Sequence, residues 1–466
     1  MYEKFYQYEK SLSSSKKRDL GIVYTPFEIV DQINSRMLSN WASDQPPKVL
    51  DPCCGTGIFL FDMAHKISEK WSMPIEQVYK ECIYGFDIDA EAVDIGLEIM
   101  NSSNLSACDS LKQDYTCYDI VVTNPPYIRI QNLTEQQRAF IQNEFDFTGG
   151  DTDIYIAFLE KLAKSKVKVG LICPSSWARN KSSSSLREHF YDNGIVEKVV
   201  DFGDRLIFEG VQTYTSIMYM GHTETLQYVN SSDNSSKFIA YSSSNPDNLF
   251  LGLDNQNKKT TKLSDLCDIK VGLATLADGL FYGECLSEDQ SGLVSFKNKY
   301  GEYKVEKSIL RKCTKASKIQ NIKENTYIIY PYTKEGTLID ESVIAHEYPF
   351  AYALLSSFKD TLLKRDKGKI KQEKWYGFGR TQGLQSLGPK LLLPPFQKDK
   401  IVVREAAAED MFISGYAVYP KEGHSLTEIK EVLTSDELFN GIKPFAKPMS
   451  NGWVGVSKGT FKHYTF

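Results

Sequence analysis

Long hydrophobic runs are missing from this sequence of 466 residues. No stretch approaches the roughly 18 uninterrupted apolar residues that a membrane span needs. The first residues, Met-Tyr-Glu-Lys-Phe-Tyr-Gln-Tyr, also lack the apolar run of a signal peptide. We therefore expect a cytoplasmic protein with no membrane partner.

Cysteine motifs and a strong charge of one sign are missing as well. The nine cysteines include no Cys-x-x-Cys pair and no histidine at ligand spacing, which predicts reduced thiols and no metal site. The formal net charge of −5 does not exclude nucleic-acid binding, because such binding depends on where the charges lie on the surface. Three basic groups in the C-terminal half, interleaved with aromatic residues, favour a polyanion surface over plain solvated faces. They are Lys258, Lys259 and Lys262; Arg311, Lys312, Lys315 and Lys318; and Lys364, Arg365, Lys367, Lys369, Lys371 and Lys374.

Short apolar strands alternate with helical patterns in the first half of the chain. This alternation is typical of a Rossmann-like, doubly wound α/β domain with a parallel sheet. Ligands of such sheets bind beyond the carboxyl ends of the strands, so residues directly after each strand are functional candidates. The expected strands are 49–50, 83–86, 120–123, 169–173, 196–200 and 216–220, and the clearest helices are 59–70, 91–100 and 154–164.

The amino-acid composition changes near residue 225. Two runs rich in serine and asparagine, 230–236 and 242–245, are prone to turns and poor in core residues, as linkers are. The length allows two or three domains. We expect an N-terminal arm (1–20), an α/β domain (21–225), a linker region (226–260) and a mixed α+β C-terminal domain (261–466).

A turn with two glycines follows the first expected strand. It reads Asp51-Pro52-Cys53-Cys54-Gly55-Thr56-Gly57 and lets a ligand approach the backbone closely, but it lacks the lysine of a phosphate-binding loop. Asp87, after the second strand, is placed to accept hydrogen bonds from ribose hydroxyls, whereas Asp89 suits a helix cap. Asp109, followed by Ser110, could accept from an adenine amino group. A nucleoside without phosphates fits these acids, which favours S-adenosyl-L-methionine over a dinucleotide.

The tetrapeptide Asn124-Pro125-Pro126-Tyr127 directly follows the expected strand 120–123. Two prolines form a rigid turn that presents the Asn124 side-chain oxygen and the Pro125 carbonyl as fixed acceptors. An aromatic amine is a poor nucleophile because its lone pair is delocalised into the ring. Two acceptors on its N–H bonds free that lone pair to attack a sulfonium methyl group. Since Tyr127 adds a face on which a base stacks, the pattern predicts methylation of a base amino group.

The order and spacing of these motifs resemble the gamma-class DNA amino-methyltransferases of restriction–modification systems, the TaqI-like N6-adenine enzymes, over most of residues 20–220. Cys53 and Cys54 depart from the family pattern, and we expect them to be bystanders in the cofactor loop. The resemblance assigns cofactor binding to Thr25, Pro26, Asp51, Pro52, Gly55, Gly57, Asp87, Ile88, Asp109, Ser110 and Phe158. It assigns catalysis to Asn124, Pro125, Pro126, Tyr127 and Phe208.

The resemblance also implies that the C-terminal domain recognises a DNA target. The adenine would be flipped out of the duplex and held between Tyr127 and Phe208. In the segment Trp375-Tyr-Gly-Phe-Gly-Arg380, we expect Arg380, with Gln382 beyond it, to read base edges. A hairpin that packs on its own domain is the alternative for this segment. The implied partner is double-stranded DNA, with a separate cognate endonuclease as a further candidate, and we expect a nucleoid-associated monomer.

Several alternatives stay open at this point. Adenine N6 is favoured over cytosine N4 because N4 members of the family more often begin the tetrapeptide with serine. Methyltransferases that act on RNA or on a protein glutamine use a similar turn, but they generally lack a second domain of this size. A DNA-binding protein with a degenerate cofactor domain is disfavoured by the intact acids and Asn124. The C-terminal half contains no clear cluster of paired acids and lysine, so we expect no DNA cleavage.

Overall fold

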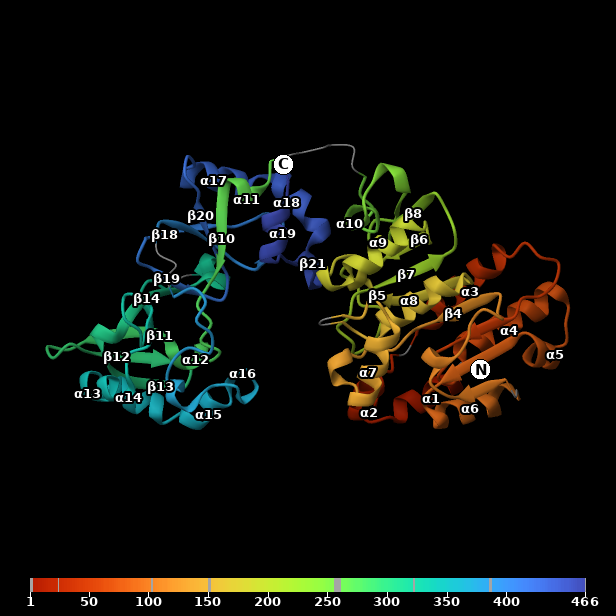
Figure 1. Cartoon of the computed structure of the whole chain (residues 1–466), viewed down its shortest axis with the longest axis horizontal. Coiled ribbons are helices and arrows are strands. Elements are labelled where there is room, and N and C mark those ends of the chain that lie inside the picture. The colour runs from red at the N-terminus through yellow and green to blue at the C-terminus, as the bar shows by residue number, and fades with distance from the viewer. Residues whose placement is uncertain are drawn as a thin grey trace. The chain divides into compact units, whose positions relative to one another are not determined.

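The chain forms two compact units, Met1–Lys258 (unit 1) and Lys259–Phe466 (unit 2), which have separate hydrophobic cores (Figure 1). The computed structural model describes residues 3–23, 25–101, 104–149, 152–254, 261–321, 323–384 and 388–465. Lys258 and Lys259, from the first basic group, lie outside the described residues. Within these ranges, no helix combines the length and apolar character needed to cross a membrane.

Unit 1 is built on one sheet, to which its described residues contribute nine strands in the order β3-β2-β1-β4-β5-β7-β6-β8-β9. Strands β1 to β5 pair in parallel, whereas β7 is antiparallel to both β5 and β6. The strand order reverses between β1 and β4, and ligands of such sheets bind at this reversal. All six expected strands are confirmed. The strands are β1 (Val49–Asp51), β2 (Ile83–Asp87), β3 (Leu105–Ala107), β4 (Ile120–Thr123), β5 (Lys168–Pro174), β6 (Val196–Asp201), β7 (Thr215–Met220), β8 (Thr225–Asn230) and β9 (Ser235–Ala240).

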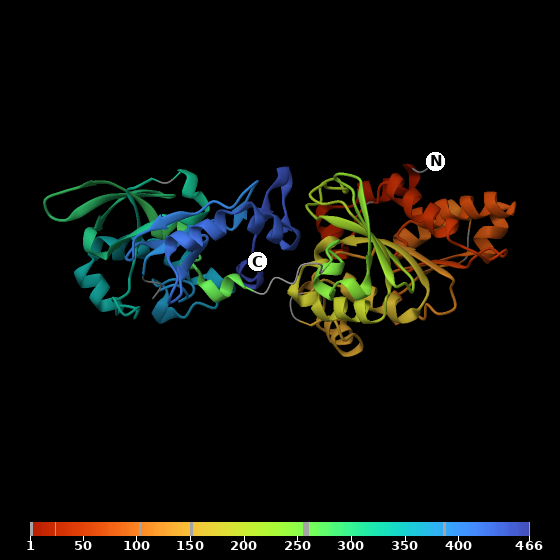
Figure 2. The same cartoon turned by 90° about the horizontal axis from the view of Figure 1, so that it is seen from above.

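Helices cover both faces of this sheet (Figure 2), which confirms the predicted doubly wound fold. Helix α3, for example, buries Ile29, Ile33 and Met37 at helical spacing, which gives it an apolar stripe. The three helices expected from the sequence correspond to α4, α6 and α8. The helices of unit 1 are α1 (Glu3–Ser11), α2 (Ser14–Leu20), α3 (Phe27–Ser39), α4 (Ile58–Trp71), α5 (Ile75–Glu81), α6 (Ala90–Met100), α7 (Glu135–Glu144), α8 (Tyr155–Ser165), α9 (Ser184–Asp192) and α10 (Pro246–Leu249).

The linker expected over residues 226–260 is in part the edge of this sheet. Strands β8 and β9 form an antiparallel hairpin from Thr225↔Ala240 to Asn230↔Ser235, and β8 pairs with β6. The polar run 230–236 therefore contains a hairpin turn, with Asn234 at φ +55°. An edge strand exposes much of its surface to water, so its composition resembles that of a linker.

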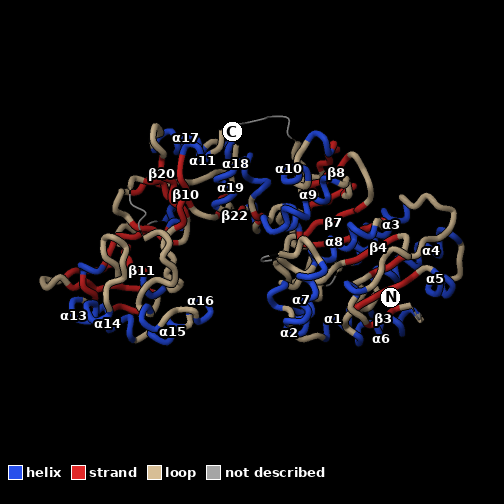
Figure 3. The backbone as a smooth tube through the Cα atoms, viewed as in Figure 1, coloured by secondary structure: helices blue, strands red, loops and turns tan. Residues whose placement is uncertain are grey.

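Unit 2 is a mixed α+β unit, as predicted, in which short strands and helices intermingle (Figure 3). Its described strands form sheets in the orders β10-β20-β16-β18, β13-β12-β11-β15-β14-β19 and β17-β22-β21. The strands are β10 (Cys267–Val271), β11 (Tyr282–Glu288), β12 (Leu293–Asn298), β13 (Gly301–Glu306), β14 (Leu310–Lys315), β15 (Thr326–Ile329), β16 (Lys390–Leu393), β17 (Phe396–Gln397), β18 (Arg404–Ala406), β19 (Met411–Ile413), β20 (Tyr416–Pro420), β21 (Lys447–Pro448) and β22 (Val454–Gly455). The helices are α11 (Leu263–Leu266), α12 (Asp278–Phe281), α13 (Glu341–Glu347), α14 (Pro349–Ser356), α15 (Lys359–Leu363), α16 (Arg365–Gly368), α17 (Leu426–Thr434), α18 (Asp436–Ile442) and α19 (Lys458–His463).

The segment 375–380 packs on its own unit, which was the alternative for it. The aromatic rings of Trp375, Tyr376 and Phe378 are buried in the core of unit 2. Arg365, counted among the basic surface groups, is buried beside them with an exposed fraction of 7%. Its guanidinium donates to the backbone carbonyls of Leu362, Thr275, Trp375 and Gly377 at 2.6–3.0 Å. Burial lowers the pKa of Arg365 to about 10. The cation therefore has a structural role in holding this segment.

Replacing Arg365 with methionine should destabilise unit 2. The substitution keeps an apolar stem of similar length but leaves four buried carbonyls without their donor, at a cost of about 3 kcal/mol or more. The urea-induced unfolding of the protein measures this loss, and faster amide exchange over residues 375–379 locates it. The exposed neighbour Lys364 provides the control, since Lys364→Met should change the unfolding free energy by about 0.5 kcal/mol at most. An unfolding midpoint of Arg365→Met equal to that of the wild type would contradict the structural role.

Candidate active site

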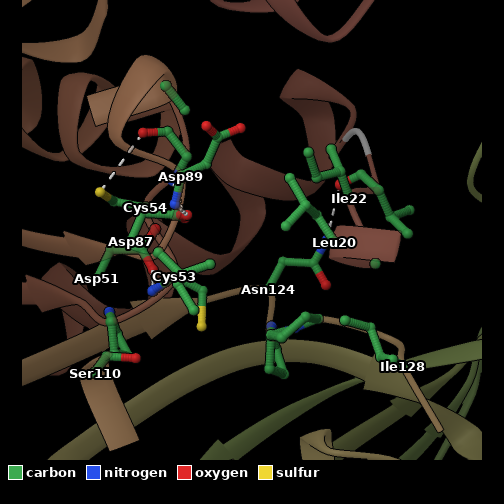
Figure 4. A pocket seen from close by; sticks show the side chains of 18 of the residues that line it. Leu20, Ile22, Asp51, Cys53, Cys54, Asp87, Asp89, Ser110, Asn124 and Ile128 are labelled. Carbon is green, nitrogen blue, oxygen red and sulfur yellow. Dashed lines mark hydrogen bonds between the residues drawn. The ribbon is translucent and has the colours of Figure 1, made fainter. Parts of the chain in front are cut away.

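A cavity of about 430 Å³ lies at the carboxyl ends of β1, β2 and β4 in unit 1. The predicted site residues that line it are Thr25, Asp51, Pro52, Gly55, Asp87, Ile88, Asp109, Ser110, Asn124, Pro125, Pro126 and Phe158. Figure 4 shows Asn124 between the side of Asp51, Asp87 and Ser110 and the side of Leu20, Ile22 and Ile128. The remaining predicted residues, Pro26, Gly57, Tyr127 and Phe208, are not among its lining residues.

The glycine turn after β1 is held by the acid at the end of β2. The two carboxylate oxygens of Asp87 accept hydrogen bonds from the backbone amides of Gly55, at 2.7 Å, and Asp89, at 2.9 Å. A carboxylate has further lone pairs, so Asp87 keeps the capacity to accept from a ligand hydroxyl. Gly55 has φ +51°, and no atom lies within 4 Å of the position that a Cβ would occupy. The turn thus leaves open space above its backbone.

Gly57 and Pro26 are the residues that directly precede helices α4 and α3. Gly57 begins α4 at φ +95°, and a Cβ there would lie 2.5 Å from Met100 Cε. Pro26 precedes the first turn of α3. Cys53 and Cys54 line the cavity, and burial raises the pKa of both thiols well above its ordinary value, which keeps them protonated. That they are bystanders in the cofactor loop stays a prediction.

Asp51 lies at the end of β1 and is 1% exposed. Its Oδ1 accepts a hydrogen bond from the backbone amide of Cys53 at 2.9 Å. Burial raises the pKa of Asp51 to about 7. Between its ordinary pKa near 3.8 and about 7, the folded protein therefore holds a proton that the unfolded chain releases.

The stability of the protein without ligand should consequently fall as the pH rises through this window. The contribution of Asp51 is fully present below about pH 4 and is lost above about pH 7, a change of about 4 kcal/mol. Asp51→Asn removes this titration, so the difference in unfolding free energy between wild type and variant should change over the same window. Urea unfolding of both proteins at several pH values checks the result. A pH-independent difference would show that Asp51 is ionised in the folded protein throughout.

Asp109 and Phe158 lie on the side of the cavity formed after β3 and by α8. The Asp109 side chain caps the short helix Ser110–Lys112 by accepting from the backbone amide of Leu111 at 3.2 Å. Its other oxygen lies 3.3 Å from the ammonium of Lys112. Phe158 is 4% exposed and packs against Leu111 in a small apolar cluster. This side therefore offers a carboxylate beside an apolar wall, as an adenine ring requires.

Asn124 occupies the turn after β4 with its amide held at one end. The amide nitrogen donates to the carbonyl of Val23 at 3.2 Å and to Thr25 Oγ1 at 3.0 Å. Because the Val23 carbonyl can only accept, these bonds fix the orientation of the amide. The opposite atom, Oδ1, is buried and accepts no hydrogen bond from any described residue. A buried acceptor without a donor costs about 1–3 kcal/mol, and an N–H group of a bound molecule would remove that cost.

Tyr127 and Phe208, the two predicted walls of a base pocket, lie next to each other. Their ring centroids are 6.1 Å apart at an interplanar angle of 59°, and Phe208 is 3% exposed. A base stacked between two rings needs about 3.5 Å on each side and nearly parallel faces. The rings instead contact each other, so the structure brings these residues together without a space for a base between them.

The N-terminal helices complete the cavity, which the sequence analysis missed. Three aromatic side chains of α1 line it, namely Phe5, Tyr6 and Tyr8. The Tyr8 hydroxyl lies 2.7 Å from Asp89 Oδ2 and 3.0 Å from Glu91 Oε2, and Lys16 of α2 donates to it at 2.8 Å. Burial and these carboxylates raise the pKa of Tyr8 to about 12. Residues 3–20, the described part of the expected N-terminal arm, are thus packed against the glycine turn and the start of α6 in unit 1.

The start of α7 is a second missed part of the cavity wall. Thr134 and Gln137 form a capping box, in which each side chain bonds the backbone of the other at 3.3 and 3.1 Å. Both residues line the cavity. The spacing Thr-x-x-Gln is visible in the sequence and could have located this helix start.

Comparison with known proteins gives this site a family context. Residues 98–208, which include the Asn124 turn and Phe158, match the family described as Eco57I restriction-modification methylase. The chain is also similar to curated type II methyltransferases. Type II methyltransferase M.HincII of Haemophilus influenzae is 27% identical over 209 residues, which cover 43% of this chain and 37% of the relative. Type II methyltransferase M.BanIII of Aneurinibacillus aneurinilyticus is 24% identical and covers 87% of this chain and 82% of the relative.

The fold has a similar solved counterpart. The Type IIL restriction-modification enzyme MmeI, solved in complex with DNA, superposes with a TM-score of 0.67 at 14% identity, over 99% of this chain and 69% of that chain. At this identity the likeness establishes the fold. The chain spans 37%, 36% and 49% of the length of three curated relatives, which are about two to three times longer than the matched part.

The family and the fold imply S-adenosyl-L-methionine as the cofactor, as the sequence predicts. The residues present fit it. The cavity combines acids at three neighbouring strand ends with an open glycine turn. We propose that Asp87 would accept from the ribose hydroxyls, and that Asp109 and Phe158 would hold the adenine.

Proposed function

We propose that this chain is a site-specific DNA methyltransferase that uses S-adenosyl-L-methionine to methylate the N6 amino group of a flipped-out adenine, as the modification enzyme of a restriction–modification system. The observation that carries the proposal is the buried Oδ1 of Asn124, which has no donor among the described residues and lies at the cavity. An exocyclic amino group supplies the missing N–H.

The chemistry follows from where the acceptors lie. The cofactor supplies an electrophilic methyl group when it is bound. Asn124 Oδ1 would accept one N–H bond of the amine, and the Pro125 carbonyl would accept the other. Both acceptors are fixed in advance. Asn124 is held by its bonds to Val23 and Thr25, and the Pro125 carbonyl is restricted by the proline that follows it. Such preorganised acceptors favour the pyramidal nitrogen of the reacting amine and the positive charge that develops on it.

For a base to stack between Tyr127 and Phe208, the two rings must move apart. Phe208 lies in the irregular segment 202–214 between β6 and β7, whereas Tyr127 follows the rigid turn. We infer that Phe208 moves when the base enters, because its backbone is not part of a strand or helix. Extrusion of a base costs a few kcal/mol, which stacking on Tyr127 would offset in part.

DNA is supported as the substrate by the related proteins. The curated relatives are type II methyltransferases, and MmeI was solved with DNA. Adenine is supported by the asparagine that begins the tetrapeptide. N4 methylation of cytosine, by the same two acceptors, is the second candidate. A cognate endonuclease, cytoplasmic location and action as a monomer belong to the same proposal.

Transfer of tritium from labelled cofactor tests the substrate class. The protein should label duplex DNA and leave ribosomal RNA and release factors unlabelled. Nucleoside analysis of the product then separates N6-methyladenine from N4-methylcytosine, and sequencing of modified bases in an expressing host gives the site. Label found only in RNA or protein would overturn the proposal.

A further inference from the structure

Unit 2 contains a large groove apart from the segment 375–380. Its volume is about 1110 Å³, and it lies between the end of β14, the short helix Ala316–Asn321 and the loop that carries β17. Six of its lining residues define what we term the lysine groove: Lys315, Lys318, Lys398, Lys400, Phe396 and Trp453.

The lysine groove has an excess of uncompensated positive charge. Lys318, Lys398 and Lys400 are exposed and Lys315 is half-buried. Among the described residues, none of these four ammonium groups forms an ion pair within 4.0 Å. A fifth lysine, Lys323, is already paired with Glu284 at 2.6 Å. Glu284 and Asp399 also line the groove, but among the described residues neither pairs with these four lysines within 4.0 Å, so the groove keeps more cations than anions.

The loop that presents two of these lysines is rigidly built. Gln397 is 1% exposed, and its amide bonds the loop on both sides, to the carbonyl of Pro394 at 2.7 Å and from the backbone amide of Val402 at 3.1 Å. The turn between Lys398 and Lys400 is closed by a backbone bond, with Asp399 at φ +61°. A buried polar side chain that holds a surface turn preorganises the groups at its tip.

Large aromatic side chains are exposed within the same groove. Phe396 is 46% and Trp453 is 39% exposed, and Phe396 is fixed by pairing of its strand with β22 opposite Gly455. A lysine-lined groove with exposed rings suits nucleic acid, whose phosphates pair with the cations and whose sugars and bases contact the rings. The rings of Trp375, Tyr376 and Phe378 are buried and cannot serve in this way.

We propose that the lysine groove is the surface by which unit 2 holds duplex DNA, with its four lysines on phosphates and with Phe396 and Trp453 on sugars and base edges. The inference rests on the proposed function, since it takes DNA as the substrate. It replaces the segment 375–380 as the principal DNA contact.

The first test removes the four charges together. Lys315→Gln, Lys318→Gln, Lys398→Gln and Lys400→Gln in the full-length protein should weaken binding of a mixed-sequence duplex at least about tenfold at low salt, and should lower the slope of log affinity against log salt by about 3 to 4. The matched control replaces Lys364, Lys367, Lys369 and Lys371 by glutamine, and should weaken binding about twofold at most. Fluorescence anisotropy over a salt series measures both.

The second test separates the rings from the charges. Phe396→Ala with Trp453→Ala should weaken duplex binding severalfold while leaving the salt slope unchanged, because apolar contacts release no counterions. Both variants should bind S-adenosyl-L-methionine like the wild type, since that cavity lies in unit 1.

The outcomes distinguish the two proposals. The assignment of DNA binding to the groove is wrong if the groove variant binds duplex DNA within twofold of the wild type. It is also wrong if the control variant loses as much affinity for DNA as the groove variant. In both cases the proposed function stands. If wild-type protein binds the cofactor but binds RNA or polyglutamate in preference to duplex DNA, both the groove assignment and the DNA substrate are wrong.

Discussion

Replacement of Asn124 by alanine is expected to slow methyl transfer by about 10²- to 10³-fold, the loss typical of removing one preorganised group that stabilises developing charge. Among the described residues, no donor reaches the buried Oδ1 of Asn124, so under the proposed function its removal leaves the amine with one acceptor in place of two. The cofactor site is built mainly from the strand ends of β1, β2 and β3, so its affinity should stay within about threefold.

The comparison needs single-turnover transfer of label into duplex DNA and calorimetry with the cofactor. Asn132 provides a matched control, because it lines the same cavity but is exposed. Asn132→Ala should keep the transfer rate within about threefold. Transfer by Asn124→Ala at the wild-type rate would show that the turn does not grip the amine, and a parallel loss of cofactor binding would show that Asn124 acts through the cavity wall.

Replacement of Gly55 by valine is expected to weaken cofactor binding by at least about 100-fold. The left-handed conformation at φ +51° costs a residue with a Cβ about 1–2 kcal/mol. The larger cost arises because Gly55 lines the cavity and no atom lies within 4 Å of its Cβ position, so the branched side chain would occupy the space above the turn.

A control with the same strain separates these two costs. Gly292 in unit 2 has φ +79° and also no atom within 4 Å of its Cβ position. Gly292→Val should therefore carry a similar backbone strain and bind the cofactor normally. Calorimetry gives the affinities, and circular dichroism confirms that both variants fold. Binding by Gly55→Val within a few fold of wild type would place the cofactor elsewhere.

The positions of Asp51, Asp87, Asp109 and Asn124 could be predicted because short-range rules determine them. Asp51 and Asp87 end apolar strands, Asn124 follows one, and parallel strands bring their carboxyl ends to one edge. Asp109 follows the short strand β3, which was not among the expected strands. The same rules identified the doubly wound sheet from six strands. Cofactor and catalytic roles follow from that geometry together with the family resemblance, and the variants above test them.

The parts that could not be predicted depend on contacts between residues distant in sequence. Tyr8 meets Asp89 across 81 residues, and nothing in a short amphipathic helix specifies which surface it covers. Trp375 is buried because Arg365 and Glu341 hold its segment, a contact that composition cannot reveal. The adjacency of Tyr127 and Phe208 was anticipated, but the closed distance between their rings depends on packing.

The packing of α1 on the cavity has a consequence for handling the protein. Phe5, Tyr6 and Tyr8 line the same cavity as Asp51, Asp87 and Asp109, so a ligand that binds there also stabilises the packing of α1. By the same linkage, a change that loosens α1 weakens binding of the ligand to the same degree. An affinity tag or fusion partner joined directly to the first residues would therefore act on a wall of the cofactor site.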